Sequence, residues 1–219
     1  MTSRGALLSA VVVGMWSASS TATDAHRLDE YLQATLLSVD RDRVTVEIGL
    51  TPGVTVAPQI MMSIDSDGDG RISSAEGEAY AREVLQSVVM VVDDRPAPLV
   101  LEESRFPEFG EMKLGLGTIR LRAAAKVNSG LGRHHLSYRN THKPELSVYL
   151  ANALVPADQR VRIAAQTRDR PQQSIALDYT VALDGLWARI SWLLAAFGTI
   201  GAGAMARRPR GVTAGSSER

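Results

Sequence analysis

The residues with the most specific chemistry form one short stretch, Asp65–Glu76, with the sequence D-S-D-G-D-G-R-I-S-S-A-E. Acidic residues stand at its first, third and fifth positions, a glycine at the sixth and a glutamate at the twelfth. Calcium is a hard cation that takes six to eight oxygen ligands at about 2.3–2.6 Å, so closely spaced carboxylates suit it. An ordinary acidic surface turn rarely carries Gly70, Ile72 and Glu76 at these offsets together. The spacing therefore predicts a calcium site.

Each position of this stretch has a role in the calcium loop of an EF-hand, whose pattern it matches. Gly70 permits the sharp turn at position 6, because a residue without Cβ adopts conformations that are unfavourable for other residues. Ile72 occupies the apolar position 8, which normally points into a core. The predicted metal ligands are Asp65, Asp67, Asp69 and Glu76 through their carboxylates, Arg71 through its backbone carbonyl, and Ser73 directly or through a water.

Two predicted helices flank the loop and form an insertion at residues 58–87. Pro58 suits the first turn of a short entering helix, Gln59–Ile64, and helical spacing of apolar residues predicts an exiting helix over 74–87. The entering helix is short, and Gly77 stands where EF-hands commonly place a bulky apolar residue. No second loop of this kind occurs in the chain. We therefore expect a single embedded site rather than a calcium-triggered groove.

Composition excludes several classes of protein. The chain has 219 residues, enough for one domain with accessory segments, and Lys and Arg balance Asp and Glu at 24 each, so no nucleic-acid partner is expected. Cysteine is absent, which rules out disulfides, zinc–thiolate sites and cysteine nucleophiles. We find no nucleophile motif, phosphate-binding glycine loop or zinc-protease motif, so an enzyme is not expected.

The two ends of the chain predict export and membrane attachment. Residues 1–25 combine Arg4, an apolar run and a segment of small residues, as in a signal peptide. Residues 186–206 approach the roughly 20 apolar residues of a transmembrane helix, and the basic tail 207–219 should stay cytoplasmic. The domain between them, 26–183, is then extracytoplasmic, periplasmic or extracellular, on a single-pass membrane protein. An uncleaved anchor or a cytosolic N-terminus is the alternative to the signal peptide, and a buried C-terminal helix is the alternative to the transmembrane span.

The predicted fold is mainly β: an antiparallel β-sandwich with the inserted helix–calcium loop–helix and the C-terminal transmembrane helix. Short runs alternate apolar and polar residues between turn signals, which is typical of strands with one buried and one wet face. The segment Phe106–Gly117 is predicted to be an irregular connection. The predicted strands are Tyr31–Leu37, Val44–Leu50, Val89–Val92, Leu99–Glu102, Thr118–Lys126, His134–Arg139, Leu146–Leu154, Arg160–Thr167 and Ser174–Leu183.

The four histidines offer weaker signals. His134 and His135 are adjacent on a predicted strand and should point to opposite faces, so they should not share one metal ion. We expect these two and His142 to be surface histidines. If a signal peptide ends at Ala25, the α-amine and imidazole of His26 could chelate copper or nickel.

Four stretches together resemble bacterial exported EF-hand domain proteins: Ala25–Tyr31, Asp65–Glu76, Gly115–Arg120 and Ser147–Leu154. Similar domains precede the membrane helices of nickel/cobalt-transporter-like and hydrogenase/urease-accessory-like proteins. The resemblance covers roughly residues 25–183, and only the calcium loop is a specific motif. It implies an extracytoplasmic β-rich domain with one calcium loop, attached to a membrane. This chain shows one candidate span instead of a multi-helix transporter, so transport by it alone is not expected.

These observations predict a membrane-anchored calcium-binding domain in which Ca²⁺ is mainly structural and binds at about 10⁻⁴–10⁻³ M. Two other functions stay open: an accessory domain that handles nickel, cobalt or copper for a neighbouring transporter, and a non-catalytic interaction module. Its partner would be a membrane protein or a second copy of the chain.

Overall fold

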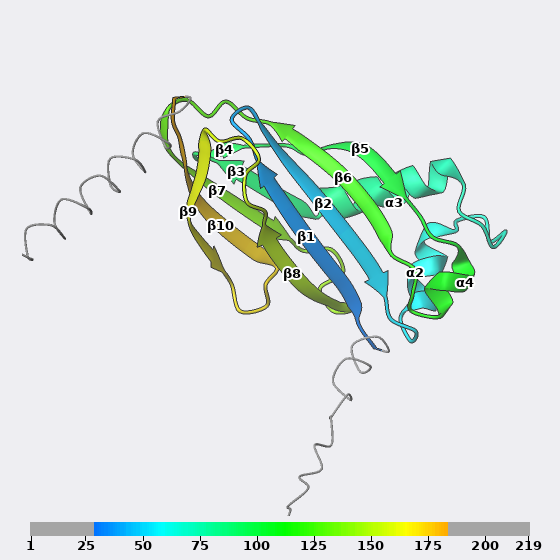
Figure 1. The fold of residues 1–219 in the computed structure, drawn as a ribbon. Helices are drawn as coiled ribbons and strands as arrows, with labels where there is room; N and C mark the ends of the chain where they lie inside the picture. Colours follow the sequence, from blue (N-terminus) through cyan, green and yellow to red (C-terminus); the bar gives the residue numbers. More distant parts are fainter. Residues whose placement is uncertain (1–28, 184–219) are drawn as a thin grey trace, which may run out of the picture.

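Two five-stranded sheets, with three helices gathered at one end, make up the part of the chain that the computed structural model describes, residues 29–183 (Figure 1). The predicted signal peptide, transmembrane helix and basic tail lie outside these residues. None of the helices within 29–183 combines the length and apolarity that crossing a bilayer requires. The structure is mainly β, and its two sheets form a sandwich.

The first sheet has the strand order β5-β6-β2-β1-β8, and the second has the order β4-β3-β7-β10-β9. The first comprises β5 (Val100–Arg105), β6 (Ile119–Lys126), β2 (Arg43–Pro52), β1 (Tyr31–Val39) and β8 (Ser147–Ala153). The second comprises β4 (Arg95–Pro96), β3 (Val88–Val92), β7 (Gly132–Asn140), β10 (Ser174–Val181) and β9 (Val161–Arg168). All nine predicted strands are confirmed, and β4 is an additional two-residue strand.

Alternation of side chains builds the core between the sheets. Along β10, for example, alternate residues from Ile175 to Val181 are buried and the others face outward. Buried apolar side chains from both sheets and from the helices form one continuous cluster. The predicted hairpin of β1 and β2 is confirmed, with Tyr31 opposite Pro52 and Val39 opposite Val44.

One strand pairing differs from the prediction of an antiparallel sandwich. Strand β8 pairs with β1 in parallel, with Tyr31 opposite Ser147 and Leu37 opposite Ala153. The connection after β7 crosses from the second sheet to the first. Strand β8 therefore starts beside the first residue of β1 and runs in the same direction. Alternation of apolar and polar residues is the same in parallel and antiparallel pairs, so this pattern could not reveal the direction.

The helices form a group beside the strands. They are α2 (Ala57–Ile64), α3 (Ser74–Gln86) and α4 (Phe109–Lys113). Helix α3 packs against β5 and β3, while α2 packs against α3 and α4. The short helix α4 falls within the segment that was predicted to be irregular. The segment from α2 to α3 follows β2 of the first sheet and precedes β3 of the second, so it connects the two sheets.

A buried polar cluster fastens α3 to the sandwich. The Tyr80 hydroxyl lies 2.7 Å from the Tyr31 hydroxyl on β1 and 3.2 Å from His142 Nε2. Burial raises the pKa of both phenols, so both stay protonated and can donate. The His142 carbonyl accepts from Gln33 Nε2 at 2.7 Å and from the Tyr149 hydroxyl at 2.9 Å. Every polar atom in such a cluster needs a partner, because an unpaired buried group costs about 1–3 kcal/mol.

The position of His142 corrects the prediction that it is a surface histidine. It lies in the connection between β7 and β8 and is 2 % exposed, with its ring against Tyr31 and Tyr80. His134 also faces inward and is only partly exposed; its Nδ1 bonds Asp93 at 2.6 Å. His135 is exposed and bonds Asp178 at 2.8 Å, as expected for a surface residue. His134 and His135 thus point to opposite faces, as predicted.

The buried imidazole makes stability depend on pH. Burial, with a smaller contribution from the charge of Lys143, lowers the pKa of His142 from 6.5 to about 4. Between these pH values the unfolded chain binds a proton that the folded chain does not, so the free energy of unfolding falls as pH falls. Over the whole interval the expected loss is about 3 kcal/mol. Chemical denaturation from pH 7 to pH 4 measures it.

Two variants identify the source of this dependence. His142→Gln should flatten the curve between pH 4 and 6.5, because it removes the buried imidazole. If His142→Gln is too unstable to fold, Tyr80→Phe should lower stability while retaining the slope. An unchanged slope in His142→Gln would assign the pH dependence to other groups.

Candidate metal centre

The loop is held between two helices whose apolar faces are buried. Helix α2 begins at Ala57, with Pro58 in its first turn as predicted, and buries Ile60, Met61 and Ile64. Helix α3 begins at Ser74 and buries one face that includes Tyr80 and Val84. Both ends of the loop are therefore fixed by the core of the domain.

Two glycines allow the backbone of the loop to turn. Gly68 and Gly70 have φ values of +73° and +77°, in the left-handed region that residues with a Cβ rarely adopt. Gly70 was predicted to make the turn, and this is confirmed. The role of Gly68 was not predicted, although a glycine at position 4 of the loop was available as a signal.

The Asp65 carboxylate organises the first half of the loop. Its Oδ1 accepts hydrogen bonds from the backbone N–H of Gly68 at 2.8 Å and of Asp69 at 3.1 Å, and its Oδ2 accepts from Gly70 N–H at 3.0 Å. Asp67 Oδ1 accepts from Asp69 N–H at 3.1 Å. Backbone amides are neutral donors, so they orient these carboxylates without cancelling the negative charge that attracts a cation.

The Glu76 carboxylate closes the loop from the first turn of α3. Its Oε1 accepts from the backbone N–H of Ser66 at 2.7 Å and from the Ser66 hydroxyl at 3.0 Å. Its Oε2 accepts from the backbone N–H of Ser73 at 2.9 Å and from the Ser73 hydroxyl at 2.8 Å. One side chain therefore joins the two ends of the loop.

These donors keep Glu76 ionised. Hydrogen bonds from Ser73, with further bonds from Ser66, lower the pKa of Glu76 from 4.5 to about 2. Because the folded-state pKa is depressed, the stabilisation is present above pH 4.5 and is lost as pH falls toward 2. Near neutral pH, a cation would therefore meet a charged carboxylate without having to displace a proton from Glu76.

Three of the predicted ligands meet at one place. One carboxylate oxygen each from Asp65, Asp67 and Glu76 lie within 4.8 Å of one another. Two oxygens bound to one calcium ion at 2.3–2.6 Å are at most about 5 Å apart. The spacing and the all-oxygen donor set therefore fit a hard divalent cation. Within residues 29–183, this is the one such group of acidic or histidine side chains.

The other three predicted ligands take different positions. Asp69 is exposed, and its Oδ1 accepts from Arg71 N–H at 2.8 Å, so its carboxylate lies outside the group of three. Arg71 follows it on the exposed side of the loop. Ser73 is the N-cap of α3: its hydroxyl accepts from Glu76 N–H at 3.3 Å, while its backbone N–H donates to the Glu76 carboxylate at 2.9 Å. This reciprocal arrangement is a capping box.

Two apolar contacts attach the loop and α3 to the domain. Ile72 is partly buried against the core, as its position in the loop predicts. The Phe106 ring fills the space beside Gly77, where an added Cβ would lie 2.8 Å from the ring. The Phe106 ring, directly after β5, therefore explains why position 77 is a glycine. The spacing of residues in the sequence could not have identified this contact.

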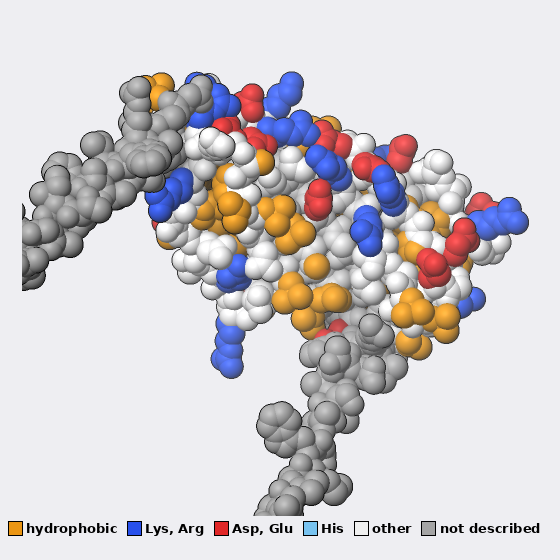
Figure 2. Space-filling model, in the orientation of Figure 1, with side chains coloured by type: hydrophobic (Ala, Val, Ile, Leu, Met, Phe, Trp, Pro, Cys, Tyr) orange, Lys and Arg blue, Asp and Glu red, His pale blue; other side chains and the backbone are white. Residues whose placement is uncertain are grey.

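Helix α4 adds a further neighbour that the sequence did not predict. Phe109 and Lys113 line a hollow of about 510 Å³ together with Met61, Met62, the loop residues Asp65–Gly68 and Gly70. Acidic and apolar side chains lie next to one another at this end of the molecule (Figure 2). No local pattern links α4 to the loop, because more than thirty residues separate them.

No protein-family model matches the chain, and no curated protein matches it.

The cap geometry predicts the effect of removing the Ser73 hydroxyl. In the presence of a chelator, Ser73→Ala should lower the free energy of unfolding by about 1 kcal/mol, because α3 loses its N-cap. Thermal melting measures the change. Ser74→Ala, at the next position in the chain, is the matched control and should have a smaller effect. Equal effects of the two substitutions would contradict the assignment of Ser73 as the cap.

Proposed function

We propose that this protein is a membrane-anchored, extracytoplasmic calcium-binding domain in which the ion is mainly structural. The observation that carries the proposal is the group of Asp65, Asp67 and Glu76 oxygens within 4.8 Å of one another. These residues hold positions 1, 3 and 12 of the loop pattern, which supply calcium ligands in EF-hands. Transition metals favour sites that include nitrogen or sulfur, whereas this group offers oxygen alone.

The way the loop is attached supports a structural role for the ion. Ile72 packs against the core of its own domain, and the faces of α2 and α3 are already buried. An opening of the two helices would expose this core and would break the contact between Tyr80 and Tyr31. Calcium would then stabilise the folded chain by mass action, and the gain would grow with the logarithm of its concentration.

The environment of the domain follows from the expected export signal in residues 1–25 and the expected span in 186–206. Calcium outside a cell can be abundant enough to occupy a site of about 10⁻⁴–10⁻³ M constantly. Within residues 29–183, no observation favours the handling of nickel, cobalt or copper, since His134, His135 and His142 each bond a different neighbour. The predicted ligand His26 lies outside these residues. The expectation of no catalytic activity stands as part of the proposal.

Thermal melting with calcium tests the proposal. At about 10 mM calcium and the affinity given above, the expected stabilisation is about 1.4–2.7 kcal/mol, which corresponds to a rise in Tm of roughly 3–10 °C over the chelated protein. Glu76→Gln should abolish the rise, because it removes a charged ligand. Isothermal calorimetry should show the matching heat of binding.

Glu78→Gln is the control, because Glu78 lies on α3 but pairs with Arg82 outside the acidic group. This variant should keep the full rise in Tm. Absence of both heat and rise in the unsubstituted protein would overturn the calcium proposal. An equal rise in Glu76→Gln would place the ion elsewhere.

A further inference from the structure

Exposed apolar side chains gather at the end of the sandwich where the described chain stops. Val155 is 91 % exposed, Leu183 63 % and Leu131 57 %. Leu154 beside Val155 is also exposed. Scattered exposed apolar residues need no explanation, but several that share one end of a domain indicate a surface that meets something else.

Strand pairing and hydrogen bonds place these residues together. Leu131 directly precedes Gly132, which lies opposite Val181, and Val181 also lies opposite Val161 of β9. Leu183 follows two residues after Val181, and the intervening Ala182 donates its N–H to the Arg160 carbonyl at 2.9 Å. Val155 and Leu154 share the lining of a surface hollow with Val161 and Arg162. We call this surface the exit end and define it by Leu131, Arg133, Leu154, Val155, Arg162 and Leu183.

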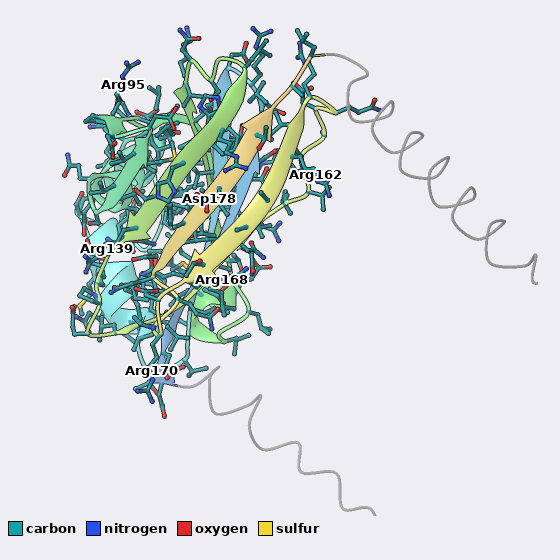
Figure 3. All side chains as sticks on the ribbon, turned by 90° about the vertical axis from the view of Figure 1, so that its left-hand side faces the viewer. Arg95, Arg139, Arg162, Arg168, Arg170 and Asp178 are labelled. Carbon is teal, nitrogen blue, oxygen red and sulfur yellow. The ribbon has the colours of Figure 1, made fainter. Side chains whose placement is uncertain are left out.

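Two arginines border the apolar residues. Arg133 on β7 and Arg162 on β9 both lie opposite Thr180 of β10, so all three share the outer face of the second sheet. Figure 3 shows Arg162 on β9 toward the end of the sandwich where β10 finishes, away from Arg139 and Arg170. In Figure 2, basic and apolar side chains lie together at the end of the molecule opposite α2 and α4.

Within residues 29–183, the acidic side chains at the same end are accompanied by basic ones. The exposed Asp93 bonds His134 beside Arg133, and the exposed Asp94 directly precedes Arg95. Asp158 is bound by Arg160, with Oδ2 at 2.8 Å from Nη2. Asp40 and Asp42 flank Arg41 in the turn between β1 and β2, and this turn reaches the exit end through bonds to Val127 and Ser129. The surface therefore combines an apolar centre with guanidinium groups, which is the composition that suits the interface of a bilayer with anionic lipids.

The position of the expected membrane span in the sequence indicates what the exit end contacts. Strand β10 ends at Val181, and the expected membrane span begins at residue 186. The five residue-to-residue steps from Val181 to residue 186 extend at most roughly 18 Å, so an anchor there would hold the exit end beside the membrane surface. We propose that the exit end rests on the bilayer, with its apolar side chains among the lipid headgroups and Arg133 against anionic lipid phosphates. This inference rests on the proposed membrane anchor and adds a lipid-binding surface to it.

Fluorescence in nanodiscs tests this contact on the full chain. Because the chain has no cysteine, single cysteines can carry a polarity-sensitive dye. Dye at Val155→Cys or Leu131→Cys, in discs that contain phosphatidylglycerol, should be quenched by doxyl-labelled lipids at least about twofold more than dye at Met62→Cys. Met62 is the matched control, because it is 72 % exposed and lies on α2 at the opposite end.

A charge reversal tests the arginine contribution. Arg133→Glu should reduce the quenching of dye at Val155→Cys in anionic discs and should change it little in phosphatidylcholine discs. Arg139→Glu is the control, since Arg139 lies on the outer face of the same strand, opposite Ser174 at its far end. Equal effects of the two substitutions would overturn the assignment of Arg133.

The outcomes separate this inference from the proposed function. A chain that enters nanodiscs but shows equal lipid quenching at Val155→Cys and Met62→Cys would overturn the lipid contact and leave the anchor in place. A chain that stays out of nanodiscs would overturn the anchor and the lipid contact together. Protection of the Val155→Cys dye from iodide without lipid quenching would assign the exit end to a protein partner or a second copy, and would also overturn the proposal.

Discussion

The contact between Tyr80 and Tyr31 joins the helical insertion to the sandwich, and the position of the candidate metal centre depends on it. Without this contact, α3 would be held mainly by apolar packing, which allows a helix to slide along or rotate against a sheet. Hydroxyl groups at 2.7 Å in a buried site accept little displacement. His142 extends the constraint to the chain between β7 and β8. Tyr80 of α3 is thereby bonded to two distant segments. Because Glu76 lies one turn earlier on the same helix, its position is fixed as well.

The chemistry of the loop follows from neutral donors acting on charged acceptors. Backbone amides and serine hydroxyls orient the carboxylates of Asp65 and Glu76, and within residues 29–183 neither carboxylate forms an ion pair with a lysine or arginine. A basic residue in this place would stabilise the acidic group and remove its affinity for a cation. The like charges of the three carboxylates are thus held close by the fold, which makes a divalent cation the natural counter-charge.

Sequence patterns located most of the local structure, although they missed the short helix α4. Alternating residues located the strands, and the spacing from Asp65 to Glu76, with Pro58 before it, located the loop and its helices. Features that depend on distant segments were missed, because no local pattern encodes them. The parallel direction of β8 is set by a crossover between sheets, the burial of His142 by Tyr31 and Tyr80, and the space beside Gly77 by Phe106. The separation of Asp69 and Ser73 from the group of three arises from hydrogen bonds within the loop, which ligand positions alone do not specify.

The place of the insertion in the chain has a consequence for how the protein folds. The segment from α2 to α3 is the covalent connection between β2 in one sheet and β3 in the other. The hairpin of β1 and β2 can form from neighbouring residues alone, whereas the second sheet begins only after this connection has been crossed. A compact loop shortens the distance that β3 must search, since closing a long flexible connection is entropically unfavourable. An ion bound at the loop would then act on the order and rate of assembly, because it would bring β3 close to the first sheet before the second sheet has formed.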